Sequence, residues 1–88
     1  MNEIRENILK KIENELRPSF IEVIDESHLH ANHNPDAKNG GTHFKIKVIS
    51  SFFKGKSKVE KHRIMHRILD YELKNGVHAL TLSLSDIE

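Results

Sequence analysis

The spacing of apolar residues along the chain predicts two amphipathic helices. The first carries Glu and Lys between its apolar positions, which gives it one stripe to bury, and Pro18 marks its end. This stripe consists of Ile4, Ile8, Leu9, Ile12 and Leu16. A second helix opens at Ser57 and Glu60, which have the spacing of a capping box, and closes at Gly76, which suits the left-handed backbone past a helix end. Its apolar face consists of Ile64, Ile68, Leu69 and Leu73.

Three other segments have the pattern of β-strands. Residues 20–24 are rich in β-branched and aromatic side chains. A strand that begins near Thr42 alternates apolar residues with lysines, which is typical of a strand with one face in water. In residues 77–84, His78 shares one side with three leucines, and small or polar residues take the other side. The order α-β-β-α-β predicts one α+β domain, with two helices on one face of a three-stranded sheet.

Residues 27–41 separate the first two strands and show no apolar periodicity. They contain three Asn, two Gly, one Pro and one Asp, all of which favour loops, and so long a loop is uncommon in a small domain unless it is functional or disordered. We therefore expect a functional loop that is mobile in the free protein. Three of the seven histidines of the chain, His28, His30 and His33, lie in it. Histidine serves as a metal ligand, a proton carrier or a polar aromatic residue, and composition alone does not decide between these.

Composition narrows the classes of function. The chain has 88 residues, 14 basic and 13 acidic, and a formal net charge of +1, so a nucleic-acid interface would need locally segregated charge. It contains no cysteine, which excludes disulfides, thiolate nucleophiles and a self-sufficient cysteine-ligated metal site. It has neither a membrane-spanning apolar run nor a recognisable catalytic constellation. We expect a cytoplasmic, non-enzymatic protein with no membrane association.

Five segments, in this order and at this spacing, resemble the BolA family over nearly the whole chain. They are residues 26–30 (ESHLH), 42–44 (THF), 48–55 (VISSFFKG), 61–66 (KHRIMH) and 77–80 (VHAL). The resemblance implies an αββααβ fold similar to class II KH domains. It also implies partnership with a monothiol glutaredoxin around a bridging 2Fe–2S cluster, to which the glutaredoxin and its glutathione contribute sulfur. The isolated chain is expected to be a monomer that holds no cofactor.

The resemblance also nominates metal ligands. The histidine of the VHAL segment is His78, and the loop position that matches the other ligand of the family is His30. The pattern alone places His78 on the same side of its strand as Leu80 and Leu82, which favours a core histidine. The resemblance favours a metal ligand instead. His28 and His33 are the less favoured alternatives to His30.

The remaining histidines have simpler interpretations. His62 and His66 are four residues apart and share a helix face, a spacing that also occurs in zinc sites. The residues between them include no acidic general base, so a surface or capping role is the better interpretation. His43 falls on the wet face of its strand and is expected to be exposed.

A basic stretch covers the turn before the second helix and the helix itself. Its members are Lys54, Lys56, Lys58, Lys61, Arg63 and Arg67. The similarity to KH domains makes DNA the alternative partner, with a role in transcription regulation. However, the G-x-x-G loop of KH domains is missing, because only Gly55 is present. Phe52 and Phe53 are the only adjacent aromatic pair, and at least one of them is expected in the core. A solvated basic face, or one that meets an acidic protein, is the favoured interpretation.

Overall fold

A computed structural model of the chain describes residues 3–26 and 43–87. Its elements follow one another in the order α-β-β-α-α-β, with a single 3₁₀ turn in the middle, which confirms the αββααβ expectation. The elements are α1 (Glu3–Leu16), β1 (Phe20–Asp25), β2 (His43–Ile49), the 3₁₀ helix η3 (Ser51–Phe53), α2 (Lys58–Ile68), α3 (Asp70–Lys74) and β3 (Ala79–Ser85).

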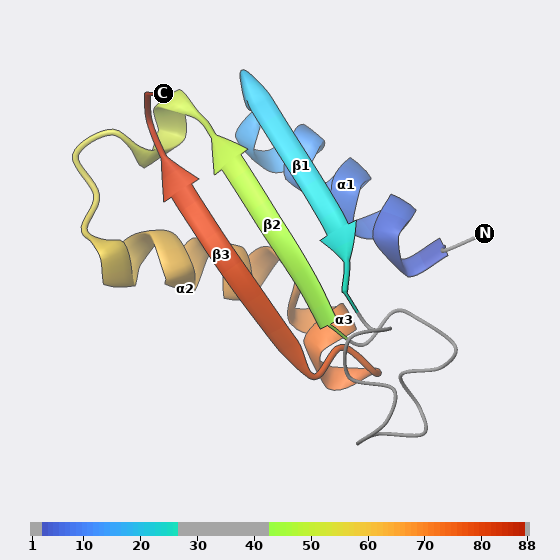
Figure 1. Ribbon diagram of the computed structural model, residues 1–88. Coiled ribbons are helices and arrows are strands. Elements are labelled where there is room, and N and C mark those ends of the chain that lie inside the picture. The colour runs from blue at the N-terminus through green and yellow to red at the C-terminus, as the bar shows by residue number, and fades with distance from the viewer. Residues whose placement is uncertain (1–2, 27–42, 88) are drawn as a thin grey trace.

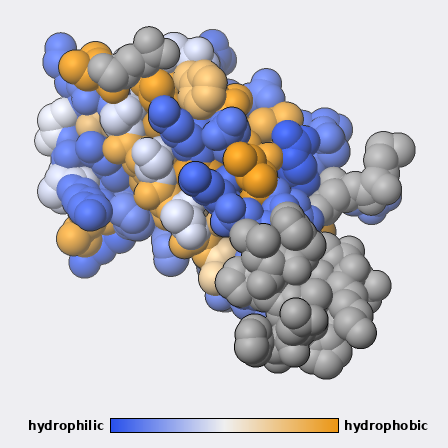
Figure 2. Space-filling model, viewed as in Figure 1, coloured by the Kyte–Doolittle hydropathy of each residue, from blue (hydrophilic) through white to orange (hydrophobic). Residues whose placement is uncertain are grey.

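The three strands form one sheet with β2 in the centre. β1 pairs with β2 in the antiparallel sense, and β3 pairs with β2 in the parallel sense, with His43 opposite Ala79. The helices lie behind the sheet on one face, as predicted (Figure 1). None of the described helices covers the other face, and Figure 2 shows its described part as a mixture of hydrophilic and hydrophobic residues.

The core lies between the helices and the inner face of the sheet. Ile8 and Ile12 of α1 and Ile46 of β2 are fully buried, as the apolar periodicities predict. Met65 and Leu69 close the core from the second helical segment. Within residues 3–26 and 43–87, no helix is both long enough and apolar enough to cross a membrane.

The turn between β2 and α2 is organised around a buried serine. The hydroxyl of Ser50 donates to the carbonyl of Leu16 at the end of α1, and it accepts from the backbone N–H of Phe52 at 3.2 Å. This geometry places Phe53 in the core with 1% exposure and leaves Phe52 53% exposed. One member of the aromatic pair is therefore a core residue, as expected.

Two expectations from the local pattern are wrong in detail. The second helix is not continuous, because α2 ends at Ile68, and Leu69 is both its C-terminal cap and the N-terminal cap of α3. The last strand begins at Ala79 rather than at Val77, because the backbone N–H of Val77 donates to the carbonyl of Glu72 at 3.0 Å. That bond ties Val77 to α3 instead of to the sheet.

Candidate functional site

His78 occupies the connection between α3 and β3, one residue before the strand. Its side chain is exposed, so the interpretation as a core histidine, in phase with the leucines of β3, is wrong. The preceding residue, Val77, is buried with 3% exposure and is tied by its N–H to Glu72. The following residue, Ala79, already belongs to the sheet. The backbone of His78 is thus held on both sides while its imidazole reaches solvent.

His43, the first residue of β2, lies beside His78. The centroids of the two rings are 6.2 Å apart and the ring planes are tilted by 50°. His43 is partly buried, which corrects the expectation that it is exposed. The cause is the parallel pairing of β2 with β3, because this pairing places Ala79 opposite His43 and brings His78 alongside. Sequence patterns do not reveal the register of two distant parallel strands, so this neighbour was not predicted.

Two adjacent imidazoles are a chemically specific arrangement. Neutral imidazole is a ligand for zinc, copper, iron and nickel, and two of them leave other coordination positions open. The described residues provide no group of three or more His, Cys, Asp or Glu side chains that would hold a metal ion alone. The predicted loop ligands His28, His30 and His33 lie outside the described residues.

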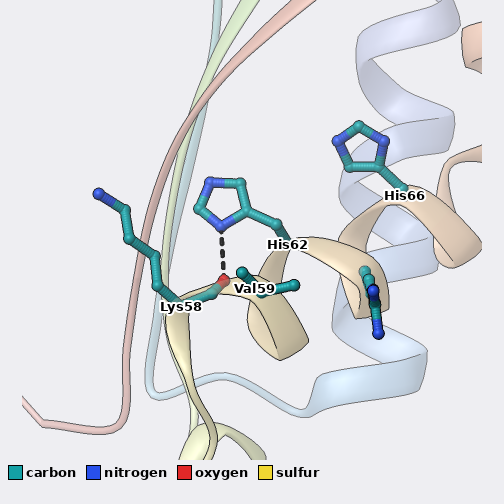
Figure 3. A pocket seen from close by; sticks show the side chains of 5 residues that line it. Lys58, Val59, His62 and His66 are labelled. Carbon is teal, nitrogen blue, oxygen red and sulfur yellow. Dashed lines mark hydrogen bonds between the residues drawn. The ribbon is translucent and has the colours of Figure 1, made fainter.

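A separate groove lies along the exposed side of α2 (Figure 3). Its volume is about 430 Å³, and apolar atoms dominate its walls. Val59 contributes an exposed apolar side chain with 59% of its surface accessible. The lining residues are Lys58, Val59, His62, Arg63 and His66. The groove is thus mainly apolar, with two basic residues, Lys58 and Arg63, among those that line it.

The two histidines of this groove stand on successive turns of α2 (Figure 3). Nδ1 of His62 lies 2.8 Å from the backbone carbonyl oxygen of Lys58. A carbonyl only accepts, so Nδ1 carries the proton, and Nε2 remains as the acceptor in the neutral ring. His66 is exposed. This bond does not cap the helix, because the unsatisfied backbone groups at the N-terminal end of a helix are N–H donors and not carbonyls.

The predicted basic stretch does not form one patch. Lys58 and Arg63 line the α2 groove, whereas Arg67 borders a second hollow beside Lys11 of α1, which has a volume of about 330 Å³. Lys61 is partly buried, and its Nζ lies 3.5 Å from the carbonyl oxygen of Leu84. Lys54 and Lys56 are exposed on the turn before α2. The positive charge is therefore spread around α2 and not concentrated on one face.

Comparison with known proteins places this geometry in a family. A family model described as "BolA-like protein" matches residues 12–87. The chain is 42% identical over 79 residues to SufE-like protein 1 (chloroplastic/mitochondrial) of Arabidopsis thaliana, covering 85% of this chain but only 21% of the relative. It is 36% identical to the DNA-binding transcriptional regulator BolA of Haemophilus influenzae, covering 92% of this chain and 75% of that one.

A solved structure shows the same fold. The BolA domain of SufE1 from Arabidopsis thaliana superimposes with a TM-score of 0.87 at 39% sequence identity, and the match covers 97% of this chain and 93% of that one. The order of elements, the family model and these relatives agree. The chain therefore belongs to the BolA family.

Proposed function

We propose that this protein is a non-enzymatic adaptor that binds a monothiol glutaredoxin and shares the ligation of a bridging 2Fe–2S cluster, for cluster delivery or for iron or redox regulation. The observation that carries the proposal is the exposed imidazole of His78, held between a buried residue and the start of a strand. A ligand held in position before binding loses little conformational freedom when the complex forms. The cytoplasm stays the predicted compartment.

The composition of the chain fits a shared cluster and not one that it holds alone. There is no cysteine, so all thiolate must come from the glutaredoxin and its glutathione. A cluster with histidine in place of thiolate on one iron has a higher reduction potential than one with thiolates only. His78 would contribute this chain's principal nitrogen ligand. Family resemblance nominates His30 as the second ligand, with His28 and His33 less favoured, and that assignment remains a prediction.

The experiment is anaerobic reconstitution with a monothiol glutaredoxin and glutathione, followed by absorption and circular dichroism spectra. His78→Ala should eliminate the mixed histidine and thiolate spectrum, since it removes the imidazole whose backbone is held by the buried Val77 and by Ala79 of the sheet. The matched control is His66→Ala, which removes another exposed histidine and should leave the spectrum unchanged. A mixed-ligand spectrum that survives in His78→Ala would contradict the proposal.

DNA binding is the second candidate function. It is favoured by two basic residues that line the α2 groove, Lys58 and Arg63, and by the relatives whose printed name is "DNA-binding transcriptional regulator BolA". Basic side chains bind phosphate oxygens without reading sequence, so such binding would weaken steeply with added salt as counterions are released.

The test of this candidate compares two variants of equal charge change. Lys58→Glu combined with Arg63→Glu should abolish binding to duplex DNA at low salt. Lys10→Glu combined with Lys74→Glu, which changes exposed residues of α1 and α3, should have a much smaller effect. No binding by the wild-type chain, even at low salt, or equal losses in both variants would remove this candidate.

A further inference from the structure

The two edges of the sheet differ in how they are covered. β1 and β3 are the edge strands, because β2 lies between them (Figure 1). In β1, the carbonyl oxygen of Val23 accepts a hydrogen bond from Nε of Arg5 in α1, at 2.8 Å. In β3, Nζ of Lys61 lies 3.5 Å from the carbonyl oxygen of Leu84, near the end of the strand. Within residues 3–26 and 43–87, no side chain donates to the beginning or the middle of β3.

The backbone of β3 carries hydrogen-bonding groups that point away from the sheet. The N–H of Ser50 donates to the carbonyl of Ser85 at 2.9 Å, so the carbonyl of Ser85 faces β2. Successive residues of a strand direct their backbone groups to alternate sides. Leu80, Leu82 and Leu84 therefore direct their N–H and C=O groups to the free edge. The groups of Leu80 and Leu82 have no partner in the described part of the chain.

The side chains of β3 leave this edge accessible. The strand reads ALTLSLS and contains no charged residue and no proline, the residues that usually protect an edge strand from pairing. Its three leucines face the helices but are only partly buried. Small residues, Ala79, Thr81 and Ser83, are exposed on the other face. Such an edge can accept a further strand, whose main chain supplies the hydrogen bonds.

We propose that the free edge of β3 is a docking site for an extended segment of a partner protein, in which apolar and acidic residues alternate. The added strand pairs with the backbone of Leu80 and Leu82. Its apolar side chains lie on the side of the helices, where they cover the partly buried leucines of β3. This site does not depend on the shared cluster proposed above.

The charges beside the edge favour acidic residues on the other face of the added strand. β2 and β3 contain two lysines and no acidic residue. Lys45 is exposed and is the register partner of Thr81, a short side chain over which the lysine can extend toward the edge. Lys47 extends the other way, with its ammonium 5.5 Å from the ring centroid of Phe20. Lys61 adds a positive charge at the end of the edge.

The probe is a synthetic peptide that alternates valine and glutamate and has the length of β3, 7 residues. It is added to the full chain, and amide hydrogen exchange is followed by NMR. In the free chain, the amides of Leu80 and Leu82 should exchange rapidly, whereas that of Thr81, which faces β2, should be protected. The peptide should protect Leu80 and Leu82. A peptide that alternates valine and lysine is the control and should bind more weakly.

Two N-methylated forms of the peptide test whether main-chain pairing is responsible. One carries its methyl groups on the valine amides and the other on the glutamate amides, so each blocks a different edge of the added strand. One form should bind at least about tenfold more weakly, because each lost hydrogen bond weakens binding severalfold. The other should bind like the unmodified peptide. No protection by the unmodified peptide, equal affinity of all three peptides, or equal losses in both methylated forms would overturn the proposal.

A charge reversal on the protein tests the preference for acidic residues. Lys45→Glu should weaken binding of the glutamate peptide about two- to fivefold, the usual scale of an exposed charge pair, and should strengthen binding of the lysine peptide. Lys10→Glu, at an exposed position of α1, is the matched control and should change neither affinity. Equal effects of the two variants would contradict the assigned charge preference.

A single-stranded nucleic acid is the other occupant that a lysine beside a strand edge could attract. It is disfavoured because β3 has no aromatic residue on which a base could stack. Oligothymidylate in the same exchange experiment should leave the amides of Leu80 and Leu82 unprotected. Protection by oligothymidylate and not by the glutamate peptide would overturn the proposal and assign the edge to nucleic acid.

Discussion

At the scale of single residues, Arg17 has an unusual backbone. It follows the last residue of α1 with φ of 43°, the one positive φ at a non-glycine residue among those described. Its N–H still donates to the carbonyl of Glu13 at 3.1 Å, so the helix ends in a left-handed residue, a position that usually holds glycine. A side chain with a Cβ is disfavoured there because the Cβ approaches the following carbonyl oxygen.

Replacing Arg17 by glycine should therefore stabilise the protein. We expect Arg17→Gly to raise the free energy of unfolding by about 0.5–1 kcal/mol, since relief of the left-handed strain exceeds the entropy that glycine adds to the unfolded chain. Denaturant unfolding measures the change. Arg17→Ala is the control, because it removes the charge and keeps the Cβ; equal stabilisation by both variants would show that backbone strain is not the cause.

Ser50 connects three segments through one hydroxyl. It is buried with 1% exposure, and it links the end of α1 to the start of η3. Ser50→Ala would leave the carbonyl of Leu16 and the N–H of Phe52 without this partner. We expect a loss of about 1–3 kcal/mol of stability, the usual cost of unsatisfied buried polar groups. Ser51→Ala, at the exposed neighbouring position, should change the melting temperature little.

At the scale of elements, the start of α2 is the clearest agreement between pattern and structure. Ser57 and Glu60 form the predicted capping box, in which the Glu60 N–H donates to the Ser57 hydroxyl at 3.1 Å and the Ser57 N–H donates to Oε1 of Glu60 at 2.9 Å. The backbone hydrogen bond from Ser57, followed by the bond to its side chain, holds the pKa of the Glu60 carboxyl below its ordinary value of 4.5. The carboxylate form is therefore the one that the fold favours.

This lowered pKa predicts the pH dependence of the cap. The stabilisation is fully present above the unfolded pKa of 4.5 and is lost as the pH falls through the lower folded value. Glu60→Gln keeps a hydrogen-bonding side chain without the titrating charge. Thermal melts should show the wild type more stable than Glu60→Gln at neutral pH, with the difference vanishing in acid. A difference that stays constant down to low pH would contradict this account.

At the scale of the whole molecule, an ion pair joins the first helix, α1, to the last, α3. Nζ of Lys11 in α1 lies 2.7 Å from Oε2 of Glu72 in α3, and the Glu72 side chain is only 5% exposed. Oε1 of Glu72 is buried and has no hydrogen-bond partner in the described part of the chain. The Lys11 ammonium also lies 5.4 Å from the ring centroid of Tyr71. The lysine is the main partner of a buried carboxylate.

Removing Lys11 should lower the free energy of unfolding by more than the ion pair contributes to it, because the Glu72 carboxylate would stay buried without its main partner. Because Lys11 is 39% exposed, we expect Lys11→Ala to destabilise the fold by about 1–3 kcal/mol, less than for a fully buried pair. Glu72→Gln, added to Lys11→Ala, should recover part of that loss by removing the unpaired charge. Denaturant unfolding of both single variants and the double variant measures the coupling. Lys10→Ala, at the exposed adjacent position, is the control; an equal loss there would exclude the ion pair as the cause.

The sequence alone determined most of the secondary structure, and the layers, because these depend on local periodicity. The stripe from Ile4 to Leu16, the alternation along β2 and the capping box at Ser57 each specify an element and its buried side. A shift of one residue in the pairing of a strand would move all its apolar side chains to the solvent face of the sheet. The alternation of apolar and polar residues along the strand therefore predicts which face is buried. The αββααβ order followed from resemblance, since periodicity alone merged α2 and α3 into one helix.

Only the tertiary structure decided what surrounds His78. The exposed position of His78 follows from the bond between Val77 and Glu72, which delays the start of β3. The neighbour His43 follows from the parallel register of β2 and β3, and the partner of the buried Glu72 carboxylate, Lys11, comes from the distant helix α1. These contacts join residues far apart in the chain. Their geometry depends on how the helices and the sheet pack, and local sequence patterns do not predict that packing.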